Sequence, residues 1–152
     1  MNTKELGNLS PTNFGGKGTK QNISGKNASK LVGDEGEKLA CEYLVKNGYK
    51  ILGRNYRINF GEIDIIAERK GLFADKTVHF VEVKALRQAQ GDFFPEEKVD
   101  YKKQNKYKRL AEIWLEKNKF PQNYPCQVDI IAVSMDSENP KIDYFKNVVE
   151  DT

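Results

Sequence analysis

The sequence predicts an α/β protein in which a mixed β-sheet is flanked by helices, with its elements in the order α-β-β-β-α-β. Stretches with apolar residues at helical spacing lie near residues 34–47 and 99–118. Segments of strand character, bounded by glycine and polar turn residues, lie between and after them. Hairpins join strands that follow each other directly, whereas a helical crossover joins parallel strands. This order therefore implies both antiparallel and parallel pairs in one sheet.

Residues 1 to about 32 precede the first element and are rich in Asn, Gly, Ser, Thr and Lys, with few large apolar side chains. Such a segment buries too little apolar surface to offset the entropy of ordering it. We predict a flexible basic tail over residues 1–32 and one folded domain over residues 33–152.

The first predicted helix covers residues 34–47, and Gly48 is suited to end it. Ala40 and Leu44 lie on its apolar stripe, and at helical spacing Glu37 falls on the same stripe. A carboxylate is unexpected there, because other charged residues of the helix already supply a face for solvent.

The remaining elements are predicted from the same patterns. Three strands are expected at Tyr49–Ile58, Glu62–Arg69 and Thr77–Ala85, with a tight turn at Asn59–Gly61 between the first two. The second helix, from about Val99 to Asn118, has an apolar face that includes Tyr107 and Trp114, and we expect both in the core. A fourth strand follows at residues 126–135, and residues 141–148 form a fifth strand or a strand-like tail.

The composition favours a soluble protein. Charged residues make up 31% of the chain, the mean hydropathy is −0.70, and no apolar run reaches the roughly 18 residues that a membrane span needs. The N-terminus lacks the apolar segment of a signal peptide and the two cysteines form no CxxC pair, so we expect a cytoplasmic protein. Zinc binding and ATP use are not indicated. The net charge of +3 permits a nucleic-acid partner without requiring one.

Acidic and basic residues interrupt two strands that are otherwise suited to a core. Side chains alternate along a strand, so Glu62, Asp64 and Ile66 share one face of the second strand, and Glu82 and Lys84 share a face of the third. If these strands are neighbours, Asp64 and Glu82 converge near a sheet edge. Two close carboxylates repel each other and need a positive partner, which Lys84 supplies in part.

A divalent cation would neutralise these carboxylates more fully. Magnesium takes oxygen ligands and needs only one or two carboxylates from the protein, which Asp64 and Glu82 provide, and the Val83 carbonyl offers a third oxygen. Lys84 is then suited to stabilise charge on a phosphate, as in metal-assisted hydrolysis of a phosphodiester. Ordinary cross-strand salt bridges are the alternative on spacing alone. The apolar setting of both strands and the inward position of Glu37 favour the metal site.

The chain closely resembles the YraN-like family of bacterial proteins over about Gly33 to Val149. The resemblance is in the segments GEKLACEYL, GYKILGRNYR, GEIDIIA, VHFVEVK and QVDIIAV, and in the lysine-bearing helix before the last of them. That family looks like the restriction-endonuclease-like, or PD-(D/E)XK, nuclease superfamily, and archaeal Holliday-junction resolvases are among its closer relatives. Ile63 stands where the superfamily motif has proline, at a position that need not bind anything.

The resemblance implies a restriction-endonuclease-like fold and a nuclease that hydrolyses DNA, with branched or otherwise irregular DNA as a candidate substrate. Asp64 matches the motif aspartate, Glu82 the central acid, Lys84 the motif lysine and Glu37 the acid of the first helix. All four are therefore candidate catalytic residues, and Asp64, Glu82 and Glu37 are candidate ligands of Mg²⁺ or Mn²⁺. A non-catalytic nucleic-acid-binding accessory module of DNA-processing machinery is the alternative, and an interaction protein with purely structural inward charges is a third. A homodimer is expected only if two active sites face one branched substrate.

Several basic residues are candidates for contacts with nucleic-acid phosphates. Arg54, Arg57 and Arg87 lie near strand ends, and Lys103 lies at the near end of the apolar face of the second helix. Each of them, taken singly, is also explained as a solvated surface residue.

Two further polar residues are assigned to structure rather than to the site. His79 is one residue out of phase with Glu82, so we expect it to face away from the acids. Asp129 lies in the middle of an apolar strand, and we expect it to be the structural partner of a base.

Overall fold

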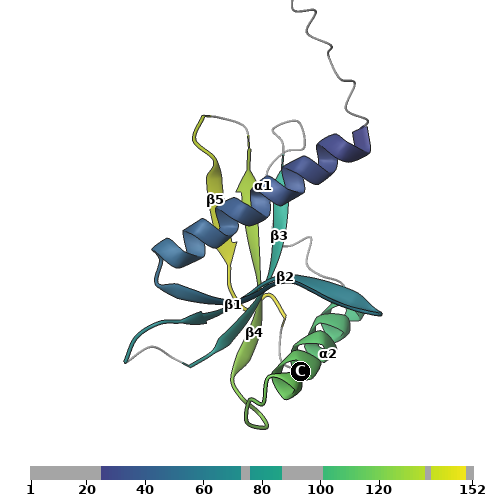
Figure 1. Ribbon diagram of the computed structural model, residues 1–152, viewed down its shortest axis with the longest axis vertical. Coiled ribbons are helices and arrows are strands. Elements are labelled where there is room, and N and C mark those ends of the chain that lie inside the picture. Colours follow the sequence, from purple (N-terminus) through teal and green to yellow (C-terminus); the bar gives the residue numbers. More distant parts are fainter. Residues whose placement is uncertain (1–24, 73–75, 87–100, 136–137, 150–152) are drawn as a thin grey trace, which may run out of the picture.

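The computed structural model describes residues 25–72, 76–86, 101–135 and 138–149 (Figure 1). Its elements in chain order are α1 (Gly25–Lys46), β1 (Tyr49–Ile58), β2 (Gly61–Arg69), β3 (Val78–Leu86), α2 (Tyr101–Lys117), β4 (Cys126–Ser134) and β5 (Lys141–Phe145). The predicted order α-β-β-β-α-β is confirmed, and residues 141–145 are a true fifth strand. No described helix is long and apolar enough to cross a membrane.

The five strands form one mixed sheet in the order β1-β2-β3-β4-β5. β3 and β4 are parallel, and the other neighbouring pairs are antiparallel. The parallel pair requires a long crossover, and α2 lies in the segment that makes it. The predicted α/β architecture, a mixed sheet flanked by helices, is therefore confirmed.

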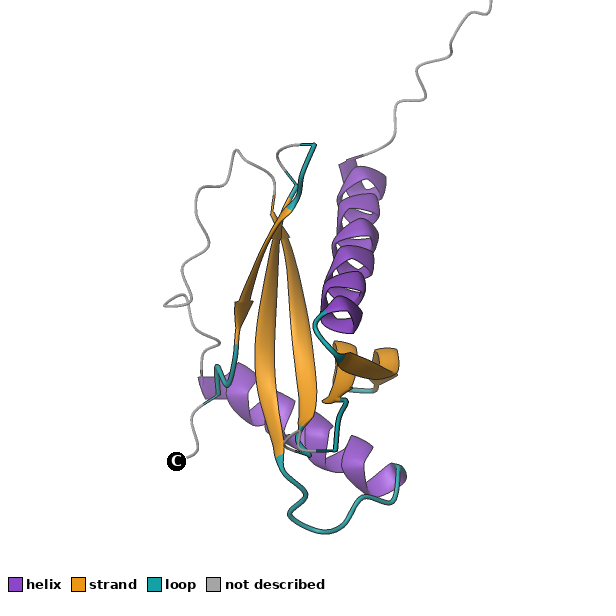
Figure 2. Cartoon of the chain, turned by 90° about the vertical axis from the view of Figure 1, so that its left-hand side faces the viewer, coloured by secondary structure: helices purple, strands orange, loops and turns teal. Residues whose placement is uncertain are grey.

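The two helices cover different parts of the sheet. Figure 2 shows α1 on one side of the sheet and the beginning of α2 on the other. On the α1 side the buried core consists of Ala40, Leu44, Tyr49, Ile65, Ala67, Val81, Ile131 and Val133. On the α2 side it consists of Ile63, Ile66, Val78, Phe80, Leu110, Ala111, Trp114, Val128 and Val149. Burial of these side chains supplies most of the driving force for folding.

α1 begins at Gly25, earlier than the helix start predicted at residue 34. Residues 25–32, assigned to the tail from sequence, are helical. They contain lysine and alanine, which favour a helix, but no apolar stripe, and Leu31 is 57% exposed. Residues 1–24 lie outside the described part of the chain. The helix ends as predicted, with Gly48 at a φ of 84° directly after its last turn.

A close contact between helix and sheet determines where α1 lies. A Cβ atom at Gly36 would lie 2.7 Å from the Cβ of Ala85 on β3, a distance that real side chains do not adopt. Glycine at this position therefore allows the backbone of α1 to approach β3 more closely than any other residue would. Glu37, the next residue, is consequently held beside the middle of the sheet.

β2 twists strongly at the point where it leaves β3. The last residue pair between the two strands is Ile65 with Val81. Ile63 alternates in phase with Ile65, yet Ile65 belongs to the α1-side core and Ile63 to the α2-side core. A bulge in β1 between Ile51 and Gly53 adds to the twist of this hairpin. β2 thus pairs with β3 from Ile65 onward and is separated from it at Asp64.

Candidate active site

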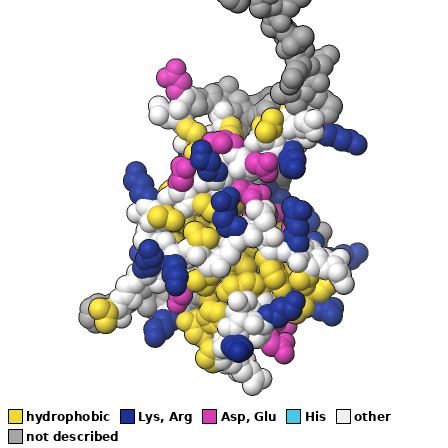
Figure 3. All heavy atoms as spheres, in the orientation of Figure 1, with side chains coloured by type: hydrophobic (Ala, Val, Ile, Leu, Met, Phe, Trp, Pro, Cys, Tyr) yellow, Lys and Arg dark blue, Asp and Glu magenta, His cyan; other side chains and the backbone are white. Residues whose placement is uncertain are grey.

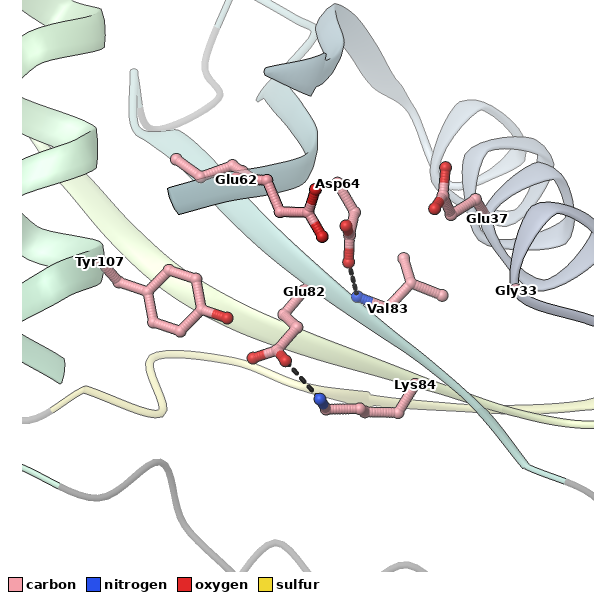
Figure 4. A pocket seen from close by; sticks show the side chains of 9 residues that line it. Gly33, Glu37, Glu62, Asp64, Glu82, Val83, Lys84 and Tyr107 are labelled. Atoms are coloured by element: carbon pink, nitrogen blue, oxygen red, sulfur yellow. Dashed lines mark hydrogen bonds and ion pairs between the residues drawn. The ribbon is translucent and has the colours of Figure 1, made fainter. Parts of the chain in front are cut away.

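A cavity of about 260 Å³ lies where β2 separates from β3, between α1 and α2 (Figure 4). It is lined by Gly33, Glu37, Glu62, Ile63, Asp64, Glu82, Val83, Lys84 and Tyr107. The four residues predicted as catalytic, Glu37, Asp64, Glu82 and Lys84, are all among them. The structure therefore brings to one cavity residues that lie on α1, β2 and β3.

The register of the sheet explains why Asp64 and Glu82 converge. Asp64 immediately precedes Ile65 and Glu82 immediately follows Val81, so in this antiparallel pair the two acids are opposite each other where the strands separate. Asp64 replaces the missing backbone pairing: its Oδ2 accepts a hydrogen bond of 2.8 Å from the backbone N–H of Val83. The N–H and carbonyl of one strand residue point to the same edge, so the Val83 carbonyl is directed toward Asp64 as well.

Glu82 is held by a base and a phenol. Lys84, two residues further along β3, forms an ion pair with it. The Glu82 side chain is 14% exposed and that of Lys84 is 40% exposed, so the ammonium group lies at the open side of the cavity. Tyr107 of α2 donates a hydrogen bond to Glu82, and burial followed by this bond raises the pKa of the phenol well above its usual value. An ammonium group and a phenol hydroxyl thus both contact the Glu82 carboxylate.

Tyr107 packs against the core, as the sequence predicts, but it also lines the cavity, a role that the sequence prediction missed. Trp114 is buried in the core as expected, but Tyr107 is only half-buried and its ring points into the cavity (Figure 4). The signal in the sequence is weak: a tyrosine on an apolar helix stripe carries a hydroxyl that needs a partner. Nothing in the spacing identifies that partner as an acid on β3.

Glu37 lines the cavity from the α1 side, apart from the other two acids (Figure 4). Within the described residues, no three His, Cys, Asp or Glu side chains are grouped closely enough to hold a metal ion together. Glu37 therefore does not complete a ligand set with Asp64 and Glu82 in this structure. The two strand acids remain, and two carboxylates are as many as a magnesium site commonly takes from a protein.

The cavity carries an excess of negative charge. The pKa of Asp64 is raised to about 6: burial is the largest cause, the hydrogen bond from Val83 opposes it, and the charges of Glu37, Glu82 and Glu62 add to the rise. An acid that resists ionisation in this way is stabilised by a proton or by a cation close to it. The oxygen donors and the charge of the cavity therefore fit a hard divalent cation.

Three of the four predicted phosphate-binding residues lie in the described part of the chain, and none of these three lines the cavity. Arg57 forms an ion pair of 2.9 Å with Glu62, and both side chains are more than half exposed. Arg54 is exposed on β1: burial raises the pKa of the Cys41 thiol and the charge of Arg54 lowers it, which places Arg54 beside α1. Lys103 is exposed near the start of α2. Arg87 lies outside the described residues.

Comparison with known proteins identifies the family. The model described as "Uncharacterised protein family UPF0102" matches residues 36–133, a range that includes all four predicted catalytic residues. The chain belongs to the UPF0102 family. The YraN-like identification made from sequence is thereby confirmed.

Similar UPF0102 proteins occur in distant bacteria. The chain is 39% identical to one from Caldicellulosiruptor bescii, with 78% of this chain and 96% of that protein covered. It is 41% identical to one from Campylobacter lari (70% and 86% covered) and 40% identical to one from Thermotoga petrophila (75% and 93% covered). Among solved structures, Pyrococcus furiosus SfsA in complex with Ca²⁺ is similar at 16% identity with a TM-score of 0.35, over 81% of this chain and 65% of that one.

The buried histidine of this UPF0102 chain belongs to a separate network on the α1 side of the sheet. His79 lies away from the acids of the cavity, as predicted, and its Nδ1 is 2.7 Å from Oδ2 of Asp129. The hydroxyl of Tyr144 donates to the same oxygen at 2.6 Å, and the side-chain amide of Gln127 and the backbone N–H of Asn147 donate to Oδ1. Burial alone would raise the pKa of Asp129, but these four partners lower it. The prediction that Asp129 is the structural partner of a base is confirmed.

Proposed function

We propose that this protein is a metal-dependent nuclease that hydrolyses phosphodiester bonds in DNA. The observation that supports this most directly is the meeting of Asp64 and Glu82 at the point where β2 leaves β3, with Lys84 at the open side of the same cavity. The raised pKa of Asp64 indicates, in addition, that too little positive charge lies near these acids to favour its ionised form. Perturbed carboxyl groups in a cavity are typical of functional sites, which favours this proposal over salt bridges that are purely structural.

Asp64 and Glu82 are the residues that would hold Mg²⁺ or Mn²⁺, with the carbonyl of Val83 beside them. When bound, such an ion supplies Lewis-acid polarisation of a phosphate oxygen and activation of water. The hydrogen bond from Val83 keeps Asp64 in position, and Tyr107 keeps Glu82 in position. Lys84 reaches solvent and neutralises charge that develops on the phosphate. Glu37, on the other side of the cavity, would support the ion or its bound water.

A second candidate is a DNA-binding module without turnover. Glu82 is already paired with Lys84, and the described acids form no group of three. Both features are expected if the inward charges only maintain the structure of a binding surface. Branched DNA, which the family resemblance suggests, is a candidate substrate for the first function and a candidate ligand for the second.

The test combines metal titration with cleavage. Calorimetric titration of Mg²⁺ and Mn²⁺ into the wild type should give binding heat that Asp64→Asn and Glu82→Gln lose, because each removes one ligand charge. On a panel of linear and branched DNA, the wild type should cleave and both variants should not. Lys84→Met should retain metal binding and lose roughly 10²- to 10³-fold in cleavage rate, the cost of removing one group that stabilises transition-state charge.

Glu116→Gln is the matched control, because Glu116 is an exposed acid on α2 outside the cavity lining. It should behave as the wild type in both assays. Cleavage by Asp64→Asn at the wild-type rate would contradict the proposed site. DNA binding without cleavage under any metal would instead support the module without turnover.

A further inference from the structure

The turn between β1 and β2 exposes an aromatic ring next to the candidate active site. Among the large hydrophobic residues of the described part of the chain that are exposed, namely Leu31, Val45, Phe60 and Leu72, only Phe60 is aromatic. It lies at the tip of the hairpin, directly before Gly61, and its exposed fraction is 41%. A strand rises about 3.3 Å per residue, so Phe60 is roughly 13 Å along β2 from Asp64.

The ring is held against α2 and is covered from one direction by a cation. The guanidinium carbon of Arg109 lies 4.9 Å from the centroid of the Phe60 ring. The adjoining Gly61 packs on α2 so closely that a Cβ there would lie 2.4 Å from Cε of Lys106 and 3.0 Å from Cδ1 of Leu110. Gly61 therefore lies directly against side chains of α2, and the turn that carries Phe60 rests on the helix.

The hairpin borders a second hollow that shares a lining residue with the cavity. This more open hollow of about 300 Å³ is lined by Arg57, Ile58, Gly61, Glu62 and Lys106, and Glu62 also lines the candidate active site. Two basic side chains therefore lie along the path from the exposed ring to the acids. Figure 3 shows the same combination more widely, with Lys and Arg side chains bordering a hydrophobic patch on the half of the molecule that carries β1, β2 and α2.

We propose that Phe60 and Arg109 form a stacking site for an unpaired DNA base, and that DNA with unpaired nucleotides next to the cleaved bond is the substrate class of this protein. The inference rests on the proposed nuclease function and specifies its substrate. An exposed aromatic ring backed by a guanidinium binds the face of any base, so it does not depend on sequence. A base in an intact duplex has both faces covered by its neighbours, whereas a base in a single strand, gap or branch is free to stack. Lys106 and Arg57 would contact the phosphates between that base and the cavity.

Binding is measured on the full chain in excess chelator, so that DNA is not cleaved. The probes are a single-stranded oligonucleotide and a blunt duplex of the same sequence, each with one 2-aminopurine whose fluorescence falls on stacking. Phe60→Leu keeps an apolar side chain but removes the π face. It should weaken single-strand binding by roughly tenfold or more, abolish the fluorescence change and leave duplex affinity unaltered. Phe60→Trp should retain both the affinity and the fluorescence change.

Leu72→Ala and Arg69→Ala are the matched controls. Leu72 is 97% exposed in the turn at the other end of β2, and Arg69 lies over the ring of Tyr49 at that same end. Both should bind as the wild type does. All variants are compared by thermal denaturation, so that a loss of folding is not read as a loss of stacking.

The outcomes separate this inference from the proposed function. Equal affinity and equal fluorescence change in the wild type and Phe60→Leu would overturn the inference, even if the wild type cleaves DNA. Failure of the wild type to bind single-stranded DNA would overturn it as well. Stacking that depends on Phe60, in a protein that cleaves no DNA with any metal, would support the stacking site and overturn only the nuclease function.

Discussion

Asp64 carries a carboxyl group in surroundings that oppose its charge. It is partly buried, three other carboxylates are close enough to act on it, and one backbone N–H is its hydrogen-bond donor. The residue therefore contributes less to the stability of the ion-free fold than a neutral side chain of the same shape would. Residues that destabilise the fold in this way are common where a protein binds a cation or performs chemistry.

The pH dependence of stability tests this directly. The folded-state pKa of Asp64 is about 6, above the roughly 3.9 of an unfolded aspartate, so the folded state binds the proton more tightly. The contribution of Asp64 to stability should therefore fall as the pH rises from about 4 to about 6. Asp64→Asn keeps an oxygen for the Val83 N–H and has no charge, so it should be more stable than the wild type at pH 7.5, and this advantage should shrink at pH 4.5. The measurement is denaturant unfolding of the metal-free protein at both pH values.

Asp34→Asn is the control for this experiment, since Asp34 is an exposed acid on α1. Its unfolding free energy should follow that of the wild type at both pH values. An Asp64→Asn variant that is less stable than the wild type at pH 7.5 would show that the Asp64 charge is compensated in the ion-free fold.

At the scale of elements, the sheet is built from two halves with different tasks. β1 and β2 form a twisted hairpin that diverges from β3 and opens the cavity. β3, β4 and β5 remain paired along their lengths and are tied together by Asp129, whose partners lie on all three of these strands and just after β5. The connected strands β3–β5 keep Glu82 and Lys84 in place. Asp64 lies opposite them on β2, the strand that diverges from β3.

Removal of the Asp129 charge should destabilise the protein substantially. An asparagine at position 129 presents amide donors to a site that already contains four donors, so at least one buried donor loses its acceptor. We expect Asp129→Asn to lower the free energy of unfolding by about 3 kcal/mol at pH 7, measured by denaturant titration. Because the folded pKa of Asp129 is lowered, its contribution is present above about pH 4 and is lost as the pH falls below that.

Tyr144→Phe is the graded comparison, because it removes a single hydroxyl that donates to Asp129. The expected loss is about 1 kcal/mol, the usual net value of one hydrogen bond. If Asp129→Asn lowers the free energy of unfolding by no more than Tyr144→Phe does, the network does not connect the strands in the way described.

At the scale of the whole molecule, acidic and basic residues are concentrated in different regions, which the net charge does not reveal. The net charge of +3 is small, yet acids surround the cavity while basic residues lie along α2 and β1. Residues 1–24 add Lys4, Lys17 and Lys20 against Glu5. A DNA backbone attracted by the basic residues would be drawn toward an acidic cavity, which is tolerable only if a cation screens the acids.

Deletion of residues 1–24 should reduce non-specific DNA affinity in a salt-dependent manner. Each lysine that contacts a phosphate contributes about 0.9 to the slope of log K against log salt, so the deletion should make the slope shallower. Affinities of the full and shortened chains should converge at high salt, as measured by fluorescence anisotropy from low to high salt. A variant with Lys4, Lys17 and Lys20 replaced by glutamine should match the deletion. A deletion that alters affinity equally at all salt concentrations would show that charge is not the cause.

The element order and the identity of the interrupted strands could be predicted from sequence because they depend on local patterns. Alternation placed Asp64 and Glu82 on converging faces, and helical spacing placed Glu37 toward the sheet. The start of α1 could not be predicted, since residues 25–32 have helix-forming side chains but no apolar stripe. His79 was correctly separated from the acids by its phase along β3.

The amino-acid sequence by itself determined which residues are available for chemistry, because the acids and lysine stand out against apolar strands at positions set by local periodicity. Only the tertiary structure decided how they meet. The twist of β2 turns Ile63 toward α2 and opens the cavity, Tyr107 reaches Glu82 from a distant helix, and Phe60 is seated on α2 by Gly61. These contacts join segments far apart in the chain. Their geometry depends on packing between elements, which no local pattern in the sequence records.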